Sequence, residues 1–452
     1  MSIHHLLNNG LSKVSRQDFL QTMALGIAGS MTTSCQTGKV PTNQTGSSNQ
    51  RSTGQKGTSP FSPPATVPQE VNKPIELEPI KSDADRKTAP VPTPLPPDQR
   101  VGYALVGLGH LTLEELLPAF AECKKSKPVA LVSGSPDKLQ KVAAQYGIKP
   151  THCYNYESYD QLKNNADVQA IYIVLPNSMH AEYTIRGAQA GKHILCEKPM
   201  ANSSAECRAM IDACQRAQRK LMIAYRIQYE PYNRYLREQI RQNTFGKAKF
   251  IEAFNGQASA NPKHWRHIKA LAGGGALPDI GLYCLNTLRF VLGEEPIEVF
   301  GYQYSTPGNP LFREVEEMMS WQMRFPSGIV ANCATDYNVH EARRYRVMCE
   351  RGWLNLDNGF AYEGQALTTS RAKEQQVIQE HVKIAAKNQF ATEIDHFSDC
   401  ILHNRTPYTP GEEGLQDQRI IEAIYQSAQE GRPVKLPLIE KRDAFRGTEP
   451  QD

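Results

Sequence analysis

The chain is 452 residues long, which is enough for about two or three domains. Its 51 lysines and arginines nearly balance its 47 aspartates and glutamates, so the formal net charge is only +4. Because no block of basic residues stands out, the composition argues against a nucleic-acid partner.

The first 35 residues are typical of an export signal. Residues 19–31, FLQTMALGIAGSM, form an apolar run that is too short to cross a bilayer and suits the core of such a signal. The preceding motif SRQDFL resembles the twin-arginine signal with Gln17 in place of the second arginine, and Cys35 follows Ser34 as at a weak lipoprotein cleavage site. An amphipathic helix of a cytoplasmic protein is the alternative. We expect export to the periplasm and no membrane span.

Residues 36–100 are predicted to form a disordered linker. They are rich in Ser, Thr, Gln, Gly and Pro, and such a composition cannot bury a core. The proline-rich stretch 90–97 favours the extended polyproline II conformation. It is either a spacer or an arm that lies along the folded body or a neighbouring subunit.

The first folded domain begins with Val101–Gly109, VGYALVGLG, in which an apolar strand leads into a glycine turn and then a helical pattern. Such a turn lets a pyrophosphate approach the backbone, and the helix N-terminus offers free N–H groups. We therefore expect Gly107, Gly109 and His110 to bind a dinucleotide. Thr112 stands where the full fingerprint has a third glycine, and an ordinary tight turn is the alternative.

Strand and helix signals alternate from residue 101 to about 225. Further apolar strands are predicted at 128–132, 170–175, 193–196 and 221–225. Ser135 caps a helix that Gly147 ends, and Ser203 with Glu206 makes a capping box for another. This alternation predicts an α/β fold with a parallel, doubly wound sheet of Rossmann type.

The ten cysteines are scattered without paired spacing. Several, such as Cys207 and Cys214, lie on the apolar stripe of a predicted helix. Buried free thiols are therefore favoured over a disulfide framework or a zinc site, and we predict no bound metal.

The end of the second strand indicates which cofactor binds. NAD sites usually place a carboxylate there to bind the ribose 2′-hydroxyl. This strand ends at Ser133 without a carboxylate, and Lys138 lies one helical turn further on. A hydroxyl, free N–H groups and a cation suit a 2′-phosphate, so we predict NADP. Ser135 caps the following helix. It either has that role alone or also binds the phosphate.

Two later strands end in sequences suited to a ligand. Residues 175–177, LPN, close the third strand, and residues 196–199, CEKP, close the fourth. Ligands bind at the carboxyl ends of the strands in such sheets. The residues assigned to the cofactor on this ground are Leu175, Pro176, Asn177, Glu197 and Lys198. A surface ion pair between the last two is the alternative.

The second half of the chain, about 226–440, changes its period. Residues 319–325 alternate apolar with polar, as in a half-buried antiparallel strand. Further strands are expected near 248–254, 297–303, 329–335 and 345–350. Two apolar-striped helices follow, and the second should end at Gly431. We expect an α+β domain with a mostly antiparallel open sheet, whose outer face is the interface of a homo-oligomer, a dimer or a tetramer.

The most informative stretch of this half is Gly273–Tyr283, GGGALPDIGLY. Its three glycines allow close approach to a ligand, and a helix should begin near Asp279. Asp279 and Tyr283 are four residues apart, so they share a face beside the buried stripe of that helix. A capping Asp and a half-buried Tyr are the alternative.

Seven motifs carry a resemblance to a known family: GYALVGLG, LPNSMHAE, CEKPMA, AYRIQYEP, AGGGALPDIGLYCLN, LGEEPIEV and GEEGLQDQRIIEAIYQSA. Together they resemble the glucose–fructose oxidoreductase family of dehydrogenases, the Gfo/Idh/MocA group, over residues 100–435. The resemblance implies an N-terminal arm, a tightly held NADP and sugar substrates. It also implies that Arg226, Trp265 and Arg266 lie near the cofactor or substrate, with His180 as a further contact. Pro278 is a departure from the family pattern.

The chemistry of aldose oxidation suggests roles for three residues. Removing hydrogen from C1 needs a base for the hydroxyl proton and a hydride acceptor, which the nicotinamide supplies. A free Tyr has a pKa of about 10, and a nearby Lys lowers it by favouring the phenolate. With the resemblance, this assigns Tyr283 as acid–base, Lys198 as its electrostatic partner and Asp279 as sugar-binding support.

Three functions are compatible with the sequence. The first is oxidation of an aldose such as glucose to its lactone and reduction of a ketose such as fructose to a polyol, on one tightly bound NADP. The second is an NADP-dependent aldose dehydrogenase that exchanges its cofactor. The third is a nucleotide-binding sensor without catalysis, against which the presence of Lys198, Asp279 and Tyr283 argues.

Overall fold

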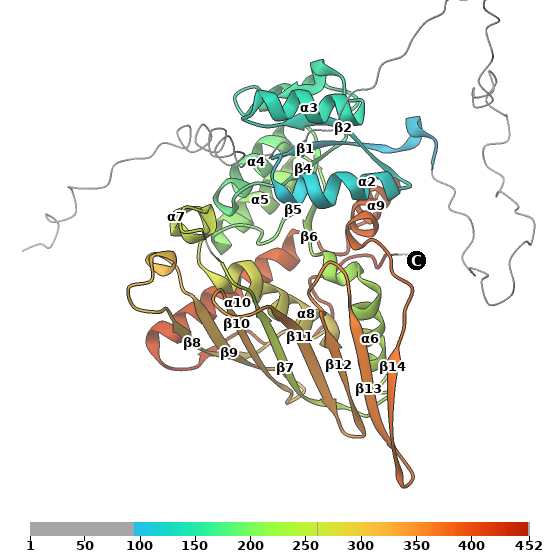
Figure 1. Cartoon of the computed structure of the whole chain (residues 1–452). Coiled ribbons are helices and arrows are strands. Elements are labelled where there is room, and N and C mark those ends of the chain that lie inside the picture. Colours follow the sequence, from blue (N-terminus) through green and yellow to red (C-terminus); the bar gives the residue numbers. More distant parts are fainter. Residues whose placement is uncertain (1–94, 260, 451–452) are drawn as a thin grey trace, which may run out of the picture. The chain divides into compact units, whose positions relative to one another are not determined.

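Figure 1 shows the computed structural model, which describes residues 95–259 and 261–450. The predicted export signal and all but the end of the predicted arm lie outside the described residues. The described end of the arm contains the 3₁₀-helix η2 (Pro97–Gln99). It lies against the first domain, because the Leu95 N–H donates to the Lys124 carbonyl at 2.9 Å. Arg100 Nε donates to the Leu95 carbonyl at 2.7 Å.

The first domain is built on a six-stranded parallel sheet in the order β3-β2-β1-β4-β5-β6, which confirms the predicted Rossmann type. The strands are β1 (Val101–Val106), β2 (Ser126–Val132), β3 (Cys153–Tyr154), β4 (Ala170–Ile173), β5 (His193–Glu197) and β6 (Leu221–Ala224). Every residue of β1, β4 and β6 is buried, as their unbroken apolar runs predict. The strand β3 is not predicted, because two residues are too few to show a period.

Helices connect these strands. They are η3 (Leu111–Leu116), α2 (Leu117–Glu122), α3 (Pro136–Tyr146), η4 (Pro150–His152), η5 (Tyr159–Asn164), α4 (Asn177–Gln189) and α5 (Ser204–Arg216). The predicted caps are confirmed, since Ser135 Oγ accepts the Lys138 N–H and Ser203 Oγ accepts the Glu206 N–H. Gly147 ends α3 in the left-handed conformation, with φ +66°.

The second domain is built on a nine-stranded sheet in the order β14-β13-β12-β11-β7-β10-β9-β8-β15. Neighbouring strands are antiparallel except β7 and β10, which run parallel. The strands are β7 (Ala248–Gly256), β8 (Glu298–Tyr304), β9 (Met318–Arg324), β10 (Val330–Asp336), β11 (Ala342–Cys349), β12 (Gly352–Asp357), β13 (Ala366–Lys373), β14 (Gln376–Val382) and β15 (Val434–Lys435). The five predicted strands are confirmed as β7 to β11, whereas β12 to β15 are not predicted.

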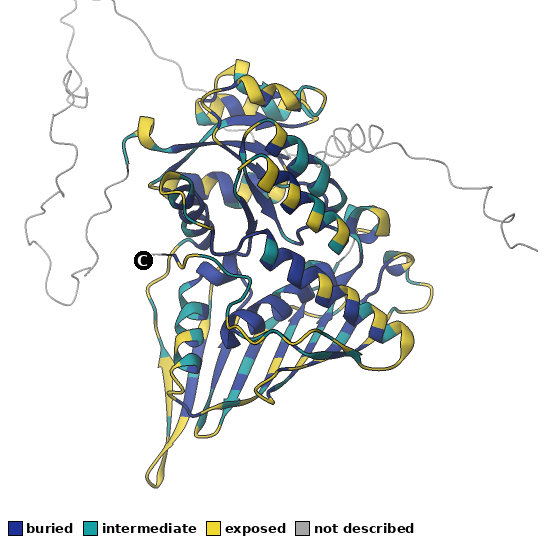
Figure 2. Cartoon of the chain, turned by 180° about the vertical axis from the view of Figure 1, so that it is seen from behind, coloured by how far each residue is buried: buried dark blue, intermediate teal, exposed yellow. Residues whose placement is uncertain are grey.

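Helices lie across one face of this sheet, as Figure 2 shows from behind. They are α6 (Pro231–Arg241), α8 (Leu282–Leu292) and α10 (Gly411–Glu430). On β9, Met319, Trp321 and Met323 are buried and the residues between them are not, which confirms the predicted alternation. The outer face of the sheet leaves Tyr302 and Tyr304 largely exposed, and its use as an oligomer interface stays a prediction. Within the described part of the chain, no helix is long and apolar enough to cross a membrane.

Helix α9 (Gln389–Leu402) brings the chain back to the first domain. The Ser398 hydroxyl lies 2.9 Å from the Tyr103 hydroxyl on β1 and 2.6 Å from the Ser126 hydroxyl on β2. Asp395 accepts the backbone N–H groups of Lys124 and Lys125, just before β2, at 2.6 and 2.9 Å. Helix α9 therefore packs on the first sheet, although Ser398 follows Tyr103 by 295 positions in the sequence.

A set of buried charges joins α8 to α10, and we call it the α8–α10 ionic cluster. Its members are Arg289, Glu295, Glu413, Asp417 and Arg446. Arg289 lies at the centre, 2.7 Å from Glu295 and 2.9 Å from Glu413, and also binds Asp417. Arg446, which follows β15 in the chain, binds Glu413 at 2.7 Å. No side chain of the cluster is more than 2% exposed, so the cluster fixes α8 on α10 out of contact with water.

Candidate active site

The glycine turn after β1 is shaped for close approach of a ligand. Gly107 has φ +99°, and a Cβ there would lie 2.1 Å from the Val174 carbonyl oxygen, so the position requires glycine. A Cβ at Gly109 would meet nothing within 4 Å, which leaves open space over the backbone before η3. Thr112, in place of the third glycine, donates from its hydroxyl to the Gly107 carbonyl at 2.6 Å and so braces the turn. His110 is 89% exposed and pairs with a glutamate of η3 at 2.8 Å.

The end of β2 lies beside the same turn. Lys138 Nζ donates to a carbonyl of the turn at 3.0 Å, and Ser133 Oγ accepts the Ser135 N–H at 3.2 Å. The carboxylate of Asp137, in the first turn of α3, pairs with Lys141 at 3.0 Å, and both of these side chains are exposed. Hydroxyls, N–H groups and an ammonium therefore border the turn. These residues fit a dinucleotide and suit a 2′-phosphate.

His180 ties together the ends of β4 and β5. Its Nε2 lies 2.8 Å from the Leu175 carbonyl, and its Nδ1 lies 2.9 Å from the Pro199 carbonyl. The ring is fully buried, so in this arrangement it positions the two loops and does not face a ligand. Asn177, which begins α4 directly after Pro176, donates from Nδ2 to the Ala272 carbonyl at 2.9 Å. The loop predicted to hold the cofactor is therefore fixed on both domains.

Glu197 and Lys198 have different partners, although they are adjacent. Glu197 is buried and accepts the Tyr172 hydroxyl at 2.8 Å, and burial raises the pKa of Glu197 above its ordinary value. Lys198 Nζ reaches the second domain, where it lies 2.7 Å from the Asp279 carbonyl and 3.3 Å from Asp279 Oδ1. The alternative of a surface ion pair between the two neighbours is therefore excluded.

Asp279 is the centre of a set of four residues that we call the Asp279 cluster: Lys198, Arg266, Asp279 and Tyr337. Its Oδ2 lies 2.9 Å from Arg266 Nε and accepts the Tyr337 hydroxyl at 2.6 Å. Burial alone would raise the pKa of Asp279, but Arg266, Lys198 and the Tyr337 hydroxyl together hold it well below its ordinary value. The carboxylate is therefore ionised at neutral pH and keeps Lys198 beside it.

Tyr283 lies one helical turn after Asp279, as predicted. Asp279 belongs to the π-helix η8 (Leu277–Gly281), which continues into α8, so the helix begins close to where the sequence places it. Lys198 Nζ lies 4.5 Å from the centroid of the Tyr283 ring, and the guanidinium carbon of Arg226 lies 4.8 Å from it. The structure therefore brings together Lys198, Asp279 and Tyr283, which come from the two domains.

Arg226 organises the wall behind Tyr283. It begins η6 (Arg226–Tyr229) directly after β6 and is only 5% exposed. Its guanidinium donates to Gln389 Oε1 at 2.7 Å and to two backbone carbonyls, and it stacks on the Tyr362 ring at 4.5 Å. These contacts hold Arg226 in place beside Tyr283, and its contact with a cofactor stays a prediction.

The residues Trp265 and Arg266 form one unit in η7 (Trp265–His267). The Arg266 guanidinium lies 4.5 Å from the centroid of the Trp265 ring, while its Nε binds Asp279. Both side chains are half-buried. The short helix α7 (Lys269–Ala272) then leads to the glycines before η8. Arg266 therefore acts on the site through Asp279.

Sequence reasoning missed Tyr337 and Glu393. Tyr337 follows β10, and no local pattern distinguishes it from other tyrosines. Glu393 has a visible signal, because it falls on the apolar stripe of α9 beside Phe390 and Ile394. Its carboxyl is buried, Oε1 has no hydrogen-bond partner among the described residues, and burial raises the pKa of Glu393 well above its ordinary value. Burial therefore favours the neutral form of this carboxyl, which lies near Glu197 and Arg226.

Two family models match the chain. One, described as "Oxidoreductase family, NAD-binding Rossmann fold", covers residues 101–225. The other, described as "Oxidoreductase family, C-terminal alpha/beta domain", covers residues 237–436. Together they account for more than half of the chain.

Known proteins share this architecture over most of their length. The aldose–aldose oxidoreductase of Caulobacter crescentus, solved with glycerol, is 44% identical, with a TM-score of 0.72 over 75% of this chain and 100% of that one. The NADP⁺-dependent D-xylose 1-dehydrogenase of Haloarcula marismortui is 30% identical over 75% of this chain and 94% of its own. The 1,5-anhydro-D-fructose reductase of Ensifer adhaerens is 25% identical over 74% of this chain and 98% of its own.

Proposed function

Because the chain belongs to the Gfo/Idh/MocA oxidoreductase family, we propose that it is an NADP-dependent sugar oxidoreductase that works on two sugars in turn. It oxidises an aldose such as glucose to its lactone and then reduces a second sugar on the same NADP. The single observation that carries this proposal is the approach of Lys198 to both Asp279 and Tyr283. A binding protein without catalysis has no need of that arrangement.

The residues of the site account for the proton chemistry. When bound, the nicotinamide supplies the hydride acceptor. Tyr283 takes the proton of the C1 hydroxyl as the aldose is oxidised and returns it when the second sugar is reduced. Lys198 donates a hydrogen bond to the same sugar oxygen and so orients it. Asp279, ionised and held by Arg266, keeps Lys198 in place and accepts a neighbouring sugar hydroxyl.

The choice of NADP is supported by the end of β2. Ser133, Ser135 and Lys138 gather beside the glycine turn, and none of them would repel a 2′-phosphate. The NADP⁺ dependence printed in the name of the haloarchaeal relative agrees with this choice.

The second sugar is either a ketose or an aldose. The motifs of the sequence favour a ketose such as fructose, which would leave as a polyol. The 44% identity to an aldose–aldose oxidoreductase favours an aldose instead. Both use one bound cofactor for oxidation and reduction, in contrast to a dehydrogenase that exchanges its NADP.

The export that we propose for this protein would favour retention of the cofactor. An enzyme in the periplasm meets little free NADP, so a dissociating cofactor would soon be lost. We propose that the arm of residues 36–97, which precedes the first strand in the sequence, helps to retain the cofactor on its own subunit or on a neighbour in a dimer or tetramer. Deleting this arm should loosen NADP retention; unchanged retention and assembly would make it a spacer.

The test uses the purified, dialysed full chain without added cofactor. Mass spectrometry of the denatured protein should find NADP. An aldose should then reduce it, as seen in the absorbance of the reduced nicotinamide, and a ketose or a second aldose should reoxidise it. In the variant Ser133→Asp the 2′-phosphate is repelled, so binding should shift toward NAD. NAD binding of the unmodified protein at least as tight as its NADP binding would contradict the cofactor assignment.

A further inference from the structure

The glycine segment before η8 is held by one residue from a distant part of the chain, Glu316. The backbone N–H groups of three successive residues donate to it. Gly275 donates to Oε2 at 2.8 Å, Ala276 to the backbone carbonyl at 3.3 Å and Leu277 to Oε1 at 2.9 Å. Glu316 lies two residues before β9. It therefore joins the segment that leads to Asp279 to the edge of strand β9.

The helix that follows this segment has no cap of its own. Ala276 stands at the N-cap position of η8, and its methyl group cannot accept a hydrogen bond. The first N–H groups of a helix have no partner within it, so they need an acceptor from elsewhere. Pro278 has no N–H, and the N–H of Leu277 is the one that Glu316 Oε1 accepts. Glu316 therefore caps this helix from outside.

The glycines let the backbone lie directly against its partners. A Cβ at Gly275 would lie 2.0 Å from the backbone carbonyl oxygen of Glu316, so this position requires glycine. A Cβ at Gly274 would lie 2.1 Å from the Tyr425 hydroxyl and would displace it. Tyr425, in α10, donates from that hydroxyl to Glu316 Oε1 at 2.8 Å. Helix α10 therefore holds Glu316 in place against the glycine segment.

The contacts of Glu316 need a carboxylate. The residue is buried, Oε1 accepts the Leu277 N–H and the Tyr425 hydroxyl, and Oε2 accepts the Gly275 N–H. A glutamine has only one acceptor oxygen in its side chain, and its NH₂ group can only donate. In that position one of the two backbone N–H groups would face another donor. The substitution Glu316→Gln should therefore loosen the segment with almost no change of size.

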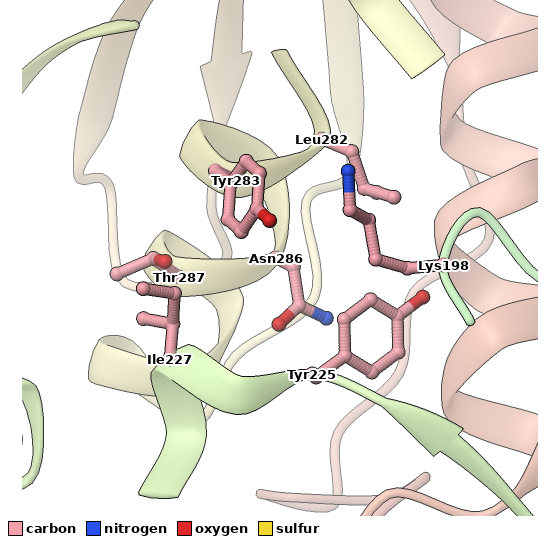
Figure 3. A pocket seen from close by; sticks show the side chains of 7 residues that line it. All are labelled: Lys198, Tyr225, Ile227, Leu282, Tyr283, Asn286 and Thr287. Atoms are coloured by element: carbon pink, nitrogen blue, oxygen red, sulfur yellow. The ribbon is translucent and has the colours of Figure 1, made fainter. Parts of the chain in front are cut away.

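The start of the helix decides where its later side chains lie. Figure 3 shows Leu282, Tyr283, Asn286 and Thr287 on this helix, where they line a small cavity together with Lys198 of the first domain. A shift at the beginning of the helix would move these side chains relative to Lys198. In an active site, a misplacement of about 1 Å can lower the rate by about 10²-fold.

We propose that Glu316 is a positioning residue for the reaction: it fixes the start of η8 and thereby the places of Asp279 and Tyr283 relative to Lys198. This inference rests on the proposed function, because it assigns Glu316 to the same site. Glu316 acts through the backbone of the glycine segment and needs no contact with sugar or cofactor.

The kinetic test is Glu316→Gln. The kcat for aldose oxidation should fall by about 10²-fold, and the KM for the aldose should change less, because the geometry of the reacting groups matters most in the transition state. The amount of retained NADP should equal that of the wild type, since the glycine turn assigned to the cofactor belongs to the first domain. Tyr425→Phe leaves both backbone N–H groups with their acceptors, so it should lower kcat to a smaller extent.

The matched control is Asp395→Asn. Asp395 also accepts two backbone N–H groups and one hydroxyl, that of Ser126 at 2.7 Å, but it does so at the start of β2. The melting temperature should fall by a similar amount in Glu316→Gln and Asp395→Asn, and only Glu316→Gln should lose kcat. A wild-type kcat in Glu316→Gln overturns the proposal, and so do equal losses of kcat in the two variants.

Hydrogen exchange followed by mass spectrometry supplies a readout that does not depend on activity. Peptides that cover residues 275–283 should exchange at least about 10-fold faster in Glu316→Gln than in the wild type, whereas Asp395→Asn should speed exchange at the start of β2 instead. Unchanged exchange over residues 275–283 overturns the proposal. If no sugar reduces the bound NADP of the wild type, the proposed function fails, and the exchange rates alone then decide whether Glu316 fixes this segment.

Discussion

Two clusters of charged residues lie at the two ends of the η8–α8 segment. They differ in how far their charged side chains are exposed. The Asp279 cluster lies at the beginning, and the α8–α10 ionic cluster surrounds Arg289 near the end. Lys198 and Asp279 are 12% and 13% exposed, whereas Arg289 and its three carboxylate partners are at most 2% exposed. The same kinds of ion pair therefore meet water at one end and are sealed from it at the other.

The difference indicates what each cluster does. Arg289 uses Nε and both terminal nitrogens on carboxylates, so none of its nitrogens is left for a ligand. Lys198 donates hydrogen bonds from its ammonium only to Asp279 among the described residues, and the same ammonium lies over the Tyr283 ring. The sealed cluster stabilises the fold, and the open one is available for chemistry. Substitutions in one cluster should lower the free energy of unfolding and those in the other should lower turnover, so comparing the two tests this difference.

Removing the central arginine should have the largest effect. Arg289→Met leaves Glu295, Glu413 and Asp417 buried with only Arg446 to balance them, so the free energy of unfolding should fall by about 3–5 kcal/mol. Denaturant titration measures the loss. The exposed pair of Arg324 with Glu298 is the control, and Arg324→Met should cost less than about 0.5 kcal/mol. Equal stability of the two variants would remove the structural role of the sealed cluster.

Removing the lysine of the open cluster should act on turnover instead. Lys198→Met should lower the rate of sugar oxidation by about 10²-fold or more, because the sugar oxygen and Tyr283 lose their cation. The free energy of unfolding should change by less than about 1 kcal/mol, since Asp279 keeps Arg266 and Tyr337. A variant that unfolds readily but retains its turnover would reverse the two assignments.

Tyr337→Phe should have a smaller effect on the same cluster. It removes one hydrogen bond to the Asp279 carboxylate and keeps the ring, so Asp279 is less firmly placed. We expect a loss of turnover of about 10-fold, which corresponds to about 1.4 kcal/mol, close to the lower end of the range for a hydrogen bond to a charged group. Steady-state kinetics of the variant beside the wild type measure it. An unchanged turnover would show that two cations alone position Asp279.

The contributions of Asp417 and Asp279 to the free energy of unfolding should change with pH in opposite directions. The pKa of Asp417 is raised in the folded protein, so its contribution to stability declines as the pH rises from about 4 to about 6. The pKa of Asp279 is depressed, so its contribution is complete above about 4 and is lost only as the pH falls below that. Each slope is at most about 1.4 kcal/mol per pH unit.

Stability curves of Asp417→Asn and Asp279→Asn, each subtracted from the wild type between pH 3 and 7, check this prediction. The difference for Asp417 should change between about pH 4 and 6, and that for Asp279 only below this window. Parallel curves for both variants would contradict the opposite signs.

Local patterns predict much of this architecture. The apolar runs give β1, β4 and β6, the alternation in residues 319–325 gives β9, and the caps at Ser135 and Ser203 hold. The strands β12 to β14 are short or carry polar residues on both faces, so no clean period marks them. Tyr337 cannot be found in this way, because its partner Asp279 is 58 residues away and only the folded sheet brings them together.

The candidate site likewise combines residues that local spacing predicts with residues that it does not. Asp279 and Tyr283 are related by helical spacing, so their common face is predictable. Only the family resemblance predicts that Lys198 reaches them from the first domain, because no spacing links residues 81 positions apart. The motif around His180 predicts a contact with the cofactor, and that contact stays a prediction; in this structure the buried ring lies between two loop carbonyls.

The return of α9 to the first sheet has a consequence for the order of events on the ribosome. Domains generally fold in the order in which they are made. Here α9 can cover Tyr103 on β1 only after Ser398, 295 residues later, has been made. The nascent first domain therefore lacks the cover of α9 until most of the second domain has been made. We expect firm binding of a nucleotide only after that point, so that loading of the cofactor follows the synthesis of both halves.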